Sequence, residues 1–225
     1  MLNDCKKIFD AVVARDLAAL KILLNSENCV EERDELGRTP LMRASLLGYD
    51  EIAEEVLQHT PRMDSVDEDG DTALILATTV DRGSIVRMLL RRGSEVNQCN
   101  KTTGETPLMA AAYSAGASCV KELLDSGADP NLQNKHGVTA LMRSAMSGRF
   151  DSARVLVQYN VLIDARDKNG RTALFHAIAK RKIEIAELLR DHGADPDLRD
   201  NDGQSPRMMA AQTEDGRLSS VFDRS

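Results

Sequence analysis

The chain of 225 residues has few aromatic side chains and no tryptophan; phenylalanine and tyrosine together make up 3% of it. This scarcity argues against a core built around large rings and against rows of stacking rings for single-stranded nucleic acid. No apolar run approaches the roughly 20 residues of a membrane span. The first ten residues, MLNDCKKIFD, lack the apolar segment of a signal peptide. We therefore expect a soluble protein of the cytoplasm or the nucleus.

An excess of basic residues is also missing, because the net charge is −7. Binders of nucleic acid or of anionic membranes need clustered Lys and Arg, so neither class is expected. The charge is uneven: residues 1–75 hold 8 Lys and Arg against 17 Asp and Glu, whereas the remainder holds 21 against 19. This difference predicts either an ordinary solvated surface or a partner surface graded from acidic to basic.

Cysteine is sparse and has no metal-binding spacing. Cys5, Cys29, Cys99 and Cys119 lie far apart with no CxxC pair. We expect four reduced cysteines of an intracellular protein and no disulfide framework.

Motifs of catalysis and of cofactor binding are absent too. The four histidines show no HExxH spacing, and the glycines form neither a phosphate-binding loop nor a GxSxG elbow. The acidic run Asp64–Asp71 lacks the glycine and closing glutamate of an EF-hand. We predict no catalytic residue, no metal ligand and no cofactor.

What the sequence does contain is a repeated phrase, seen in GRTPLMRASLLG, GETPLMAAAYSA and GVTALMRSAMSG. The glycine before each phrase recurs at intervals of 33, 34, 33, 33 and 33 residues, at Gly37, Gly70, Gly104, Gly137, Gly170 and Gly203. A fixed period of this length indicates a stack of small structural units that share one continuous core.

Each period has the same local signals. A Thr or Ser can cap a first helix through its hydroxyl group, and Pro often follows at the first helical position. A second, amphipathic helix then ends at Gly93, Gly127 or Gly193, which suit a left-handed terminal conformation; Asn160 holds this place once. A short extended segment rich in Asp, Asn and Gly follows, which we call a finger. The predicted caps are Thr39, Thr72, Thr106, Thr139, Thr172 and Ser205.

The T-P-L phrase, the LLxxGADxN ending and the period together resemble the ankyrin-repeat family over nearly the whole chain. The resemblance implies an all-α repeat fold, an ankyrin solenoid of helix-turn-helix units with hairpin-like finger loops. We predict a single domain over residues 1–225. Its repeats are an N-terminal capping repeat (1–33), five full repeats (34–66, 67–100, 101–133, 134–166 and 167–199) and a truncated C-terminal repeat (200–225).

The chain departs from the family phrase at one position, where ankyrin repeats usually have His. Apolar side chains stand there instead: Met42, Ile75, Met109, Met142, Phe175 and Met208. Their helical spacing after a cap predicts core packing, and the alternative is a methionine-rich binding stripe or a redox sensor. The T-[PA]-L-M variant is similar to ankyrin proteins of some parasitic protists, from which no function follows.

The resemblance implies that a partner protein binds a concave groove formed by fingers and inner helices. Aromatic and Arg side chains favour Tyr113, Arg38 and Arg171 as central contacts. Leu46 and Met146 either face the partner or lie between repeats, and Val138 and Ser147 face the partner in GVTALMRSAMSG. The full set of expected contacts is Arg38, Leu46, Leu47, Glu68, Asp69, Asp71, Tyr113, Met146, Lys168, Arg171 and Lys180.

The predicted function is a monomeric, non-catalytic adaptor or scaffold that binds another protein. The alternative is an inhibitor or regulatory subunit that masks the surface of an enzyme or a transcription factor, and it uses the same groove. An enzyme is the third reading, and it would need an active site that no motif indicates.

Overall fold

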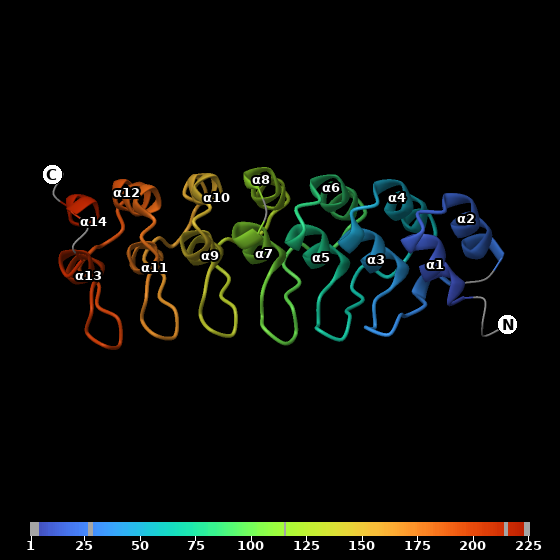
Figure 1. Cartoon of the computed structure of the whole chain (residues 1–225), viewed down its shortest axis with the longest axis horizontal. Helices are drawn as coiled ribbons and strands as arrows, with labels where there is room; N and C mark the ends of the chain where they lie inside the picture. Colours follow the sequence, from blue (N-terminus) through green and yellow to red (C-terminus); the bar gives the residue numbers. More distant parts are fainter. Residues whose placement is uncertain (1–4, 27–28, 115, 214–215, 223–225) are drawn as a thin grey trace. The chain divides into compact units, whose positions relative to one another are not determined.

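The computed structural model describes residues 5–26, 29–114, 116–213 and 216–222, and these contain helices and loops but no β-strand. The chain forms two compact units, Met1–Pro107 (unit 1) and Leu108–Ser225 (unit 2). In both units the helices come in pairs, and a finger loop connects each pair to the next (Figure 1). No helix among the described residues is long and apolar enough to span a membrane.

In unit 1 the first helices of successive pairs pack against one another, as α1 does on α3 and α3 on α5. The second helices of the pairs form another row, in which α2 contacts α4 and α4 contacts α6. The bounds are α1 Lys7–Val13, α2 Leu17–Ser26, the short 3-10 helix η1 Cys29–Glu31, α3 Pro40–Leu47, α4 Asp50–Gln58, α5 Ala73–Thr79 and α6 Gly83–Arg91.

Unit 2 repeats this arrangement, with α9, α11 and α13 in one row and α8, α10 and α12 in the other. Its bounds are α7 Pro107–Ser114, α8 Ala117–Asp125, α9 Ala140–Ser147, α10 Phe150–Leu156, α11 Ala173–Ala179, α12 Ile183–Asp191, α13 Pro206–Ala211 and α14 Gly216–Ser220. The first residue of α7 belongs to unit 1.

The hydroxyl caps are confirmed at five of the six predicted positions. In α3 the Thr39 hydroxyl oxygen accepts a hydrogen bond from the Met42 amide at 3.3 Å, which satisfies one of the amides left unpaired at a helix start. The Thr39 amide in turn donates to the Met42 sulfur at 3.4 Å. The other four caps are Thr72, Thr139, Thr172 and Ser205, and the same role for Thr106 stays a prediction.

The core confirms the prediction for the apolar phrase position, with one exception. Met42, Met109 and Met142 are each 1% exposed, and Ile75 and Phe175 are buried as well. Met208 is 37% exposed, so the core prediction is wrong there. The reason is that no further repeat follows α13 among the described residues to cover this side chain.

The backbone adopts the predicted left-handed conformation at the three glycines that end the second helices, but not at Asn160. Gly93, Gly127 and Gly193 have φ between 86° and 89°, in the left-handed region. Asn160 does not adopt a positive φ. Helix α10 ends at Leu156, and the Val161 amide donates to the Tyr159 carbonyl at 2.7 Å, a tight three-residue turn centred on Asn160.

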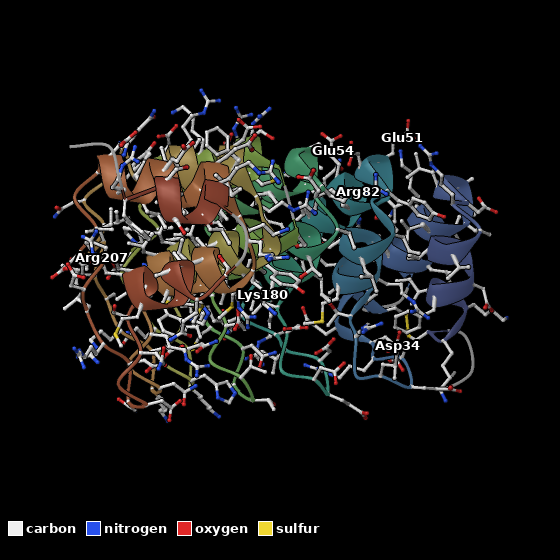
Figure 2. The ribbon with its side chains drawn as sticks, turned by 60° about the vertical axis from the view of Figure 1, so that its left-hand side comes forward. Asp34, Glu51, Glu54, Arg82, Lys180 and Arg207 are labelled. Atoms are coloured by element: carbon white, nitrogen blue, oxygen red, sulfur yellow. A yellow bond between two sulfur atoms is a disulfide. The ribbon has the colours of Figure 1, made fainter. Side chains whose placement is uncertain are left out.

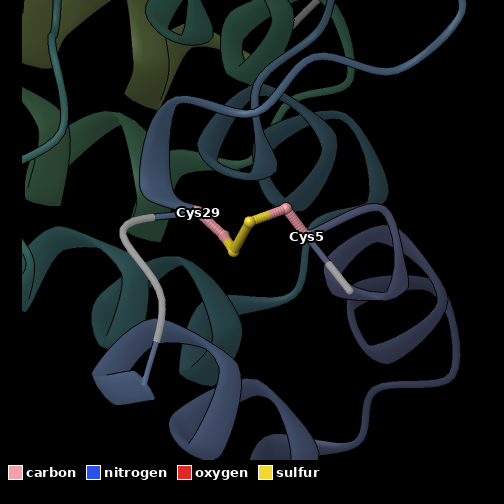
Figure 3. Close-up of a disulfide and its surroundings, with 2 residues drawn as sticks. All are labelled: Cys5 and Cys29. Atoms are coloured by element: carbon pink, nitrogen blue, oxygen red, sulfur yellow. A yellow bond between two sulfur atoms is a disulfide. The ribbon is translucent and has the colours of Figure 1, made fainter. Parts of the chain in front are cut away.

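A disulfide joins Cys5 to Cys29, with their Cα atoms 5.2 Å apart (Figure 3). The prediction of four reduced cysteines is therefore wrong for this pair. Cys5 precedes α1 and Cys29 follows α2, and two antiparallel helices of similar length bring these two places together. The cysteines therefore no longer argue for a reducing compartment. Cys99 and Cys119 form no disulfide, as predicted.

Candidate functional site

A groove of about 620 Å³ lies within unit 2, between two fingers and the ends of three first helices. The end of α7 contributes Tyr113, and α9 contributes Arg143 and Met146. The remaining lining residues come from the two fingers and from α11 with its C-terminal end: His136, Val138, Asp167, Asn169, Arg171, Phe175, His176, Ala179 and Lys180.

Every finger is held by one Asp or Asn, which lies three residues before the phrase glycine in five fingers and four residues before it, at Asn100, in the finger with the extra residue. In the finger of residues 167–171, the Oδ1 atom of Asp167 accepts hydrogen bonds from the amides of Asn169 and Arg171 at 2.8 and 2.9 Å. Such a carboxylate closes a tight turn by replacing a backbone acceptor. The same kind of contact is made by Asp34, Asp67, Asn100, Asn134 and Asp200.

In two fingers, the residue directly after the phrase glycine is an arginine (Arg38 or Arg171) that pairs with Asp residues of the next finger. We call this contact the finger clamp. The Nε atom of Arg171 donates to Asp200 at 3.1 Å and its Nη2 atom lies 3.4 Å from Asp202, while the guanidinium lies over the Phe175 ring at 5.1 Å. Burial alone would raise the pKa of Asp200, but the hydrogen bonds from Arg171 and from backbone amides hold that pKa below its ordinary value. Arg171 is therefore a part of the scaffold as well as of the groove wall.

Beneath the groove, His176 forms a buried pair with Asp167. The Nε2 atom of His176 lies 2.9 Å from Oδ2 of Asp167, and both residues are 8% exposed. Burial lowers the pKa of His176, the Asp167 carboxylate opposes this shift, and the charges of Arg171 and Lys180 add to the lowering. His176 is thus neutral at pH 7.

At the mouth of the groove, an aromatic ring and two cations lie near one another. Tyr113 is 51% exposed, and the Arg143 guanidinium lies over its ring at 5.5 Å. Lys180 lies at the C-terminal end of α11 (Figure 2) and is exposed. Its ammonium group makes no ion pair or hydrogen bond with the residues that the structure describes. Met146 is half-buried beside them. The mouth therefore offers apolar surface and positive charge together.

The sequence model of ankyrin repeats (3 copies) matches residues 8–100, 80–167, 108–200 and 160–221, which together span nearly the whole chain. The chain belongs to the ankyrin-repeat family. Ankyrin repeats are in general protein–protein interaction modules without enzymatic activity of their own.

Individual ankyrin-repeat relatives match over parts of the chain. A Caenorhabditis briggsae ankyrin repeat and KH domain-containing protein is 32% identical over 125 residues, which are 54% of this chain and 5% of that protein. The rat ankyrin repeat and SAM domain-containing protein 6 is 35% identical over 105 residues, 46% of this chain and 12% of the relative. The matched segments are thus small parts of much longer proteins.

Among solved structures, the ankyrin repeat domain of Bcl-3, described as a unique member of the IkappaB protein family, has the same fold. The TM-score is 0.81 with 22% identity, over 95% of this chain and 96% of that one. The all-α ankyrin fold expected from the repeat is confirmed.

The ankyrin groove of unit 2 contains four of the predicted contact residues: Tyr113, Met146, Arg171 and Lys180. Lys168 is exposed on the same finger as Arg171 but does not line the groove. Val138, expected to face a partner, is 6% exposed, and this prediction is wrong: its side chain is packed into the groove floor.

The predicted contact residues of unit 1 do not line the groove of unit 2, and most of them contact neighbouring residues of their own unit. Arg38 pairs with Asp67 at 3.1 Å and lies 4.0 Å from Asp69, and Leu46 and Leu47 are half-buried. Asp71 accepts a hydrogen bond from the Asn100 side-chain amide at 2.6 Å, and burial is the main reason that its pKa is raised. Glu68 and Asp69 are exposed on the fingertip.

Sequence reasoning missed the buried His176–Asp167 pair and the Arg143–Tyr113 contact. A signal for the first was available, because an acidic or amide residue precedes the phrase glycine by three positions in five fingers and by four in the other. Arg43 and His176 occupy the same repeat position, nine residues after Asp34 and Asp167, and Arg43 likewise lies 3.5 Å from Asp34. The shared spacing of nine residues therefore predicts that His176 lies near Asp167, as Arg43 lies near Asp34.

Proposed function

We propose that this chain is a non-catalytic protein-interaction module, an adaptor or scaffold, which binds a partner protein in the groove of unit 2. The single observation that supports this most is the mouth of that groove. There Tyr113, at 51% exposure, lies beside the half-buried Met146 and the exposed Lys180, on helices that are themselves rigidly packed. Exposed aromatic side chains on a fixed scaffold are typical centres of protein interfaces.

The absence of enzymatic activity is part of the proposal. The groove is lined by two imidazoles, those of His136 and His176, and by one carboxylate, Asp167, which is engaged with His176 and with the finger backbone. Among the described residues, no cluster of three His, Cys, Asp or Glu side chains could hold a metal ion. Adaptor and inhibitor use the same groove, so the identity of the partner decides between them.

Photo-crosslinking of the whole chain tests the proposal. A photoreactive phenylalanine analogue replaces Tyr113 in one variant and Arg154, exposed on the outer helix α10, in the control. We expect position 113 to crosslink a defined partner in a cell extract and position 154 to leave that partner uncrosslinked. Equal crosslinking from both positions, or none from position 113, contradicts the proposal.

Arg171→Glu is unsuitable as a binding variant. A carboxylate at this place would face Asp200 and Asp202 and would disturb the finger clamp itself. Lys180→Glu changes the groove charge without breaking a contact between the described residues, and it is therefore the sharper substitution.

A further inference from the structure

The groove of unit 2 carries more positive than negative charge. Its lining includes Arg143, Arg171 and Lys180, and Asp167 is the one carboxylate among the lining residues. Asp167 is buried and already accepts hydrogen bonds from two backbone amides and contacts His176. The preceding finger brings no carboxylate to its turn, because Asn134 stands where other fingers have Asp.

The positive charges differ in how they are compensated. Arg171 is turned toward Asp200 and Asp202, which neutralise it. His176 adds no charge at neutral pH, because burial disfavours its protonated form. Lys180 has no counter-charge among the described residues, and Arg143 lies over the exposed ring of Tyr113. The positive potential is therefore concentrated at the mouth of the groove.

A ligand that suits this mouth needs acidic and apolar groups side by side. A basic peptide would be repelled by Lys180 and Arg143, and a purely apolar one would cover Lys180 without supplying a counter-charge, which is costly. Nucleic acid would need a row of phosphate contacts, and the chain has a net charge of −7. A peptide with carboxylates and an apolar side chain can supply a counter-charge to Lys180, approach the Arg143 guanidinium and cover Tyr113 and Met146 together.

One finger of unit 1 has acidic side chains at matching repeat positions. Asp69 stands where the groove of unit 2 has His136 and Asn169, and Asp71 stands where it has Val138 and Arg171. Arg38 and Arg43 of unit 1 do match Arg171 and Arg143, whereas Leu47 and Val80 stand at the position of Lys180. The preference for an acidic ligand thus depends on variable residues, of which Lys180 is the clearest, and not on the repeat as such.

We propose that the groove of unit 2 binds an extended acidic peptide segment of the partner protein. Carboxylates of this segment pair with Lys180 and Arg143, and an apolar side chain packs on Tyr113 and Met146. This inference rests on the proposed function and names the chemistry of the partner.

Selection of random peptides displayed on phage against the whole chain tests this proposal. We expect the enriched peptides to combine Asp or Glu with an apolar or aromatic residue. In a titration with one enriched peptide, Lys180→Glu should raise the Kd by at least about tenfold, and so should amide replacement of the peptide's carboxylates. The control Arg154→Glu makes the same charge change outside the groove and should leave the Kd within about twofold.

Each other outcome overturns the acidic-peptide proposal. Enrichment of neutral or basic peptides, equal effects of Lys180→Glu and Arg154→Glu, or no enrichment at all would show that the groove does not select carboxylates. Crosslinking of a partner from position 113 would then still support the interaction module. Failure of the crosslinking removes the proposed function itself, so the two failures are distinguishable.

Discussion

Arg38 in unit 1 and Arg171 in unit 2 occupy the same position of their repeats and make the same contacts. Each donates through Nε to a buried Asp of the next finger at 3.1 Å, and each places Nη2 near a second Asp two residues further on. Arg38 is the more enclosed of the two, with 14% of its side chain exposed against 34% for Arg171. The finger clamp is therefore common to both units.

The surroundings of the clamp differ between the units. The finger that accepts the clamp has Glu68, Asp69 and Asp71 in unit 1 but Asn201, Asp202 and Gln204 in unit 2. The finger that donates it has Glu35 and Leu36 beside the arginine in unit 1 but Lys168 and Asn169 in unit 2. Because the scaffold contacts are equal, this difference in charge is not needed for folding. It teaches that the charge of the binding surface is set mainly at finger positions beside the clamp, while Arg171 itself belongs to both the scaffold and the groove wall.

The largest expected effect tests whether the scaffold is equal in both units. Met42→Ala and Met142→Ala should each lower the free energy of unfolding by about 2–5 kcal/mol, since each removes a fully buried side chain and leaves a cavity. Met208→Ala, at the same repeat position but 37% exposed, should cost less than about 1 kcal/mol. Urea unfolding followed by circular dichroism measures all three. A loss at Met142 as small as that at Met208 would mean that the methionines are a surface stripe.

The disulfide is a feature of unit 1 that has no counterpart in unit 2, whose only cysteine is Cys119. Replacing Cys5 and Cys29 by Ser should lower the stability of unit 1 by about 2–4 kcal/mol, because the crosslink restricts the unfolded chain. Hydrogen exchange resolved by residue should show faster exchange in α1 to α3 and little change in α9 to α12. A reducing agent should affect the wild type and leave the double Ser variant unchanged. An equal loss in both units would instead indicate that the repeats unfold as one cooperative array.

The sequence was sufficient for those features that depend on neighbours within one repeat. The hydroxyl caps, the glycine reversals and the buried methionines each follow from local spacing, and they were confirmed at nearly all positions. Met208 is the exception because its burial depends on a following repeat, and Asn160 is another because the early end of α10 changes its turn.

Contacts between consecutive repeats were not predictable in the same way. Arg171 was expected to face a partner, yet it reaches Asp200 and Asp202, which lie 29 and 31 residues further along the chain. A period of 33 residues places equivalent fingers of neighbouring repeats close in space, so residues about one period apart must be read together. The Cys5–Cys29 disulfide is a different case, because it lies within one repeat and depends on the antiparallel pairing of α1 and α2.

A smaller effect concerns the glycines of the fingertips. Gly137 and Gly203 have φ of 77° and 79°, so that Ala is strained equally at both by about 1–2 kcal/mol. At Gly137 an added Cβ atom would also lie 2.9 Å from the Lys168 amide nitrogen, whereas at Gly203 it meets nothing within 4 Å. Gly137→Ala should therefore cost about 1–3 kcal/mol more than Gly203→Ala in urea unfolding. In unit 1, Gly37→Ala should fall between them, because its contacts to Glu68 begin at 3.1 Å. Equal losses at Gly137 and Gly203 would show that consecutive fingers yield without resistance.

The smallest expected effect separates His176 from Arg43, its counterpart in unit 1. The pKa of His176 lies below 6.5 in the folded chain, chiefly because of burial, so between that lower value and 6.5 the unfolded chain binds more protons. Stability should therefore fall as the pH falls through this window, by at most about 1.4 kcal/mol per pH unit. His176→Gln keeps a donor toward Asp167 without titrating, and it should remove this slope.

Arg43→Gln should change stability by an amount that is constant between roughly pH 5 and 7, since a guanidinium keeps its proton throughout. The measurement is urea unfolding at closely spaced pH values, with the histidine titration followed by NMR. If wild type and His176→Gln show the same slope, the Asp167 carboxylate fully offsets the effect of burial, and the pKa of His176 is the same in the folded and unfolded chains.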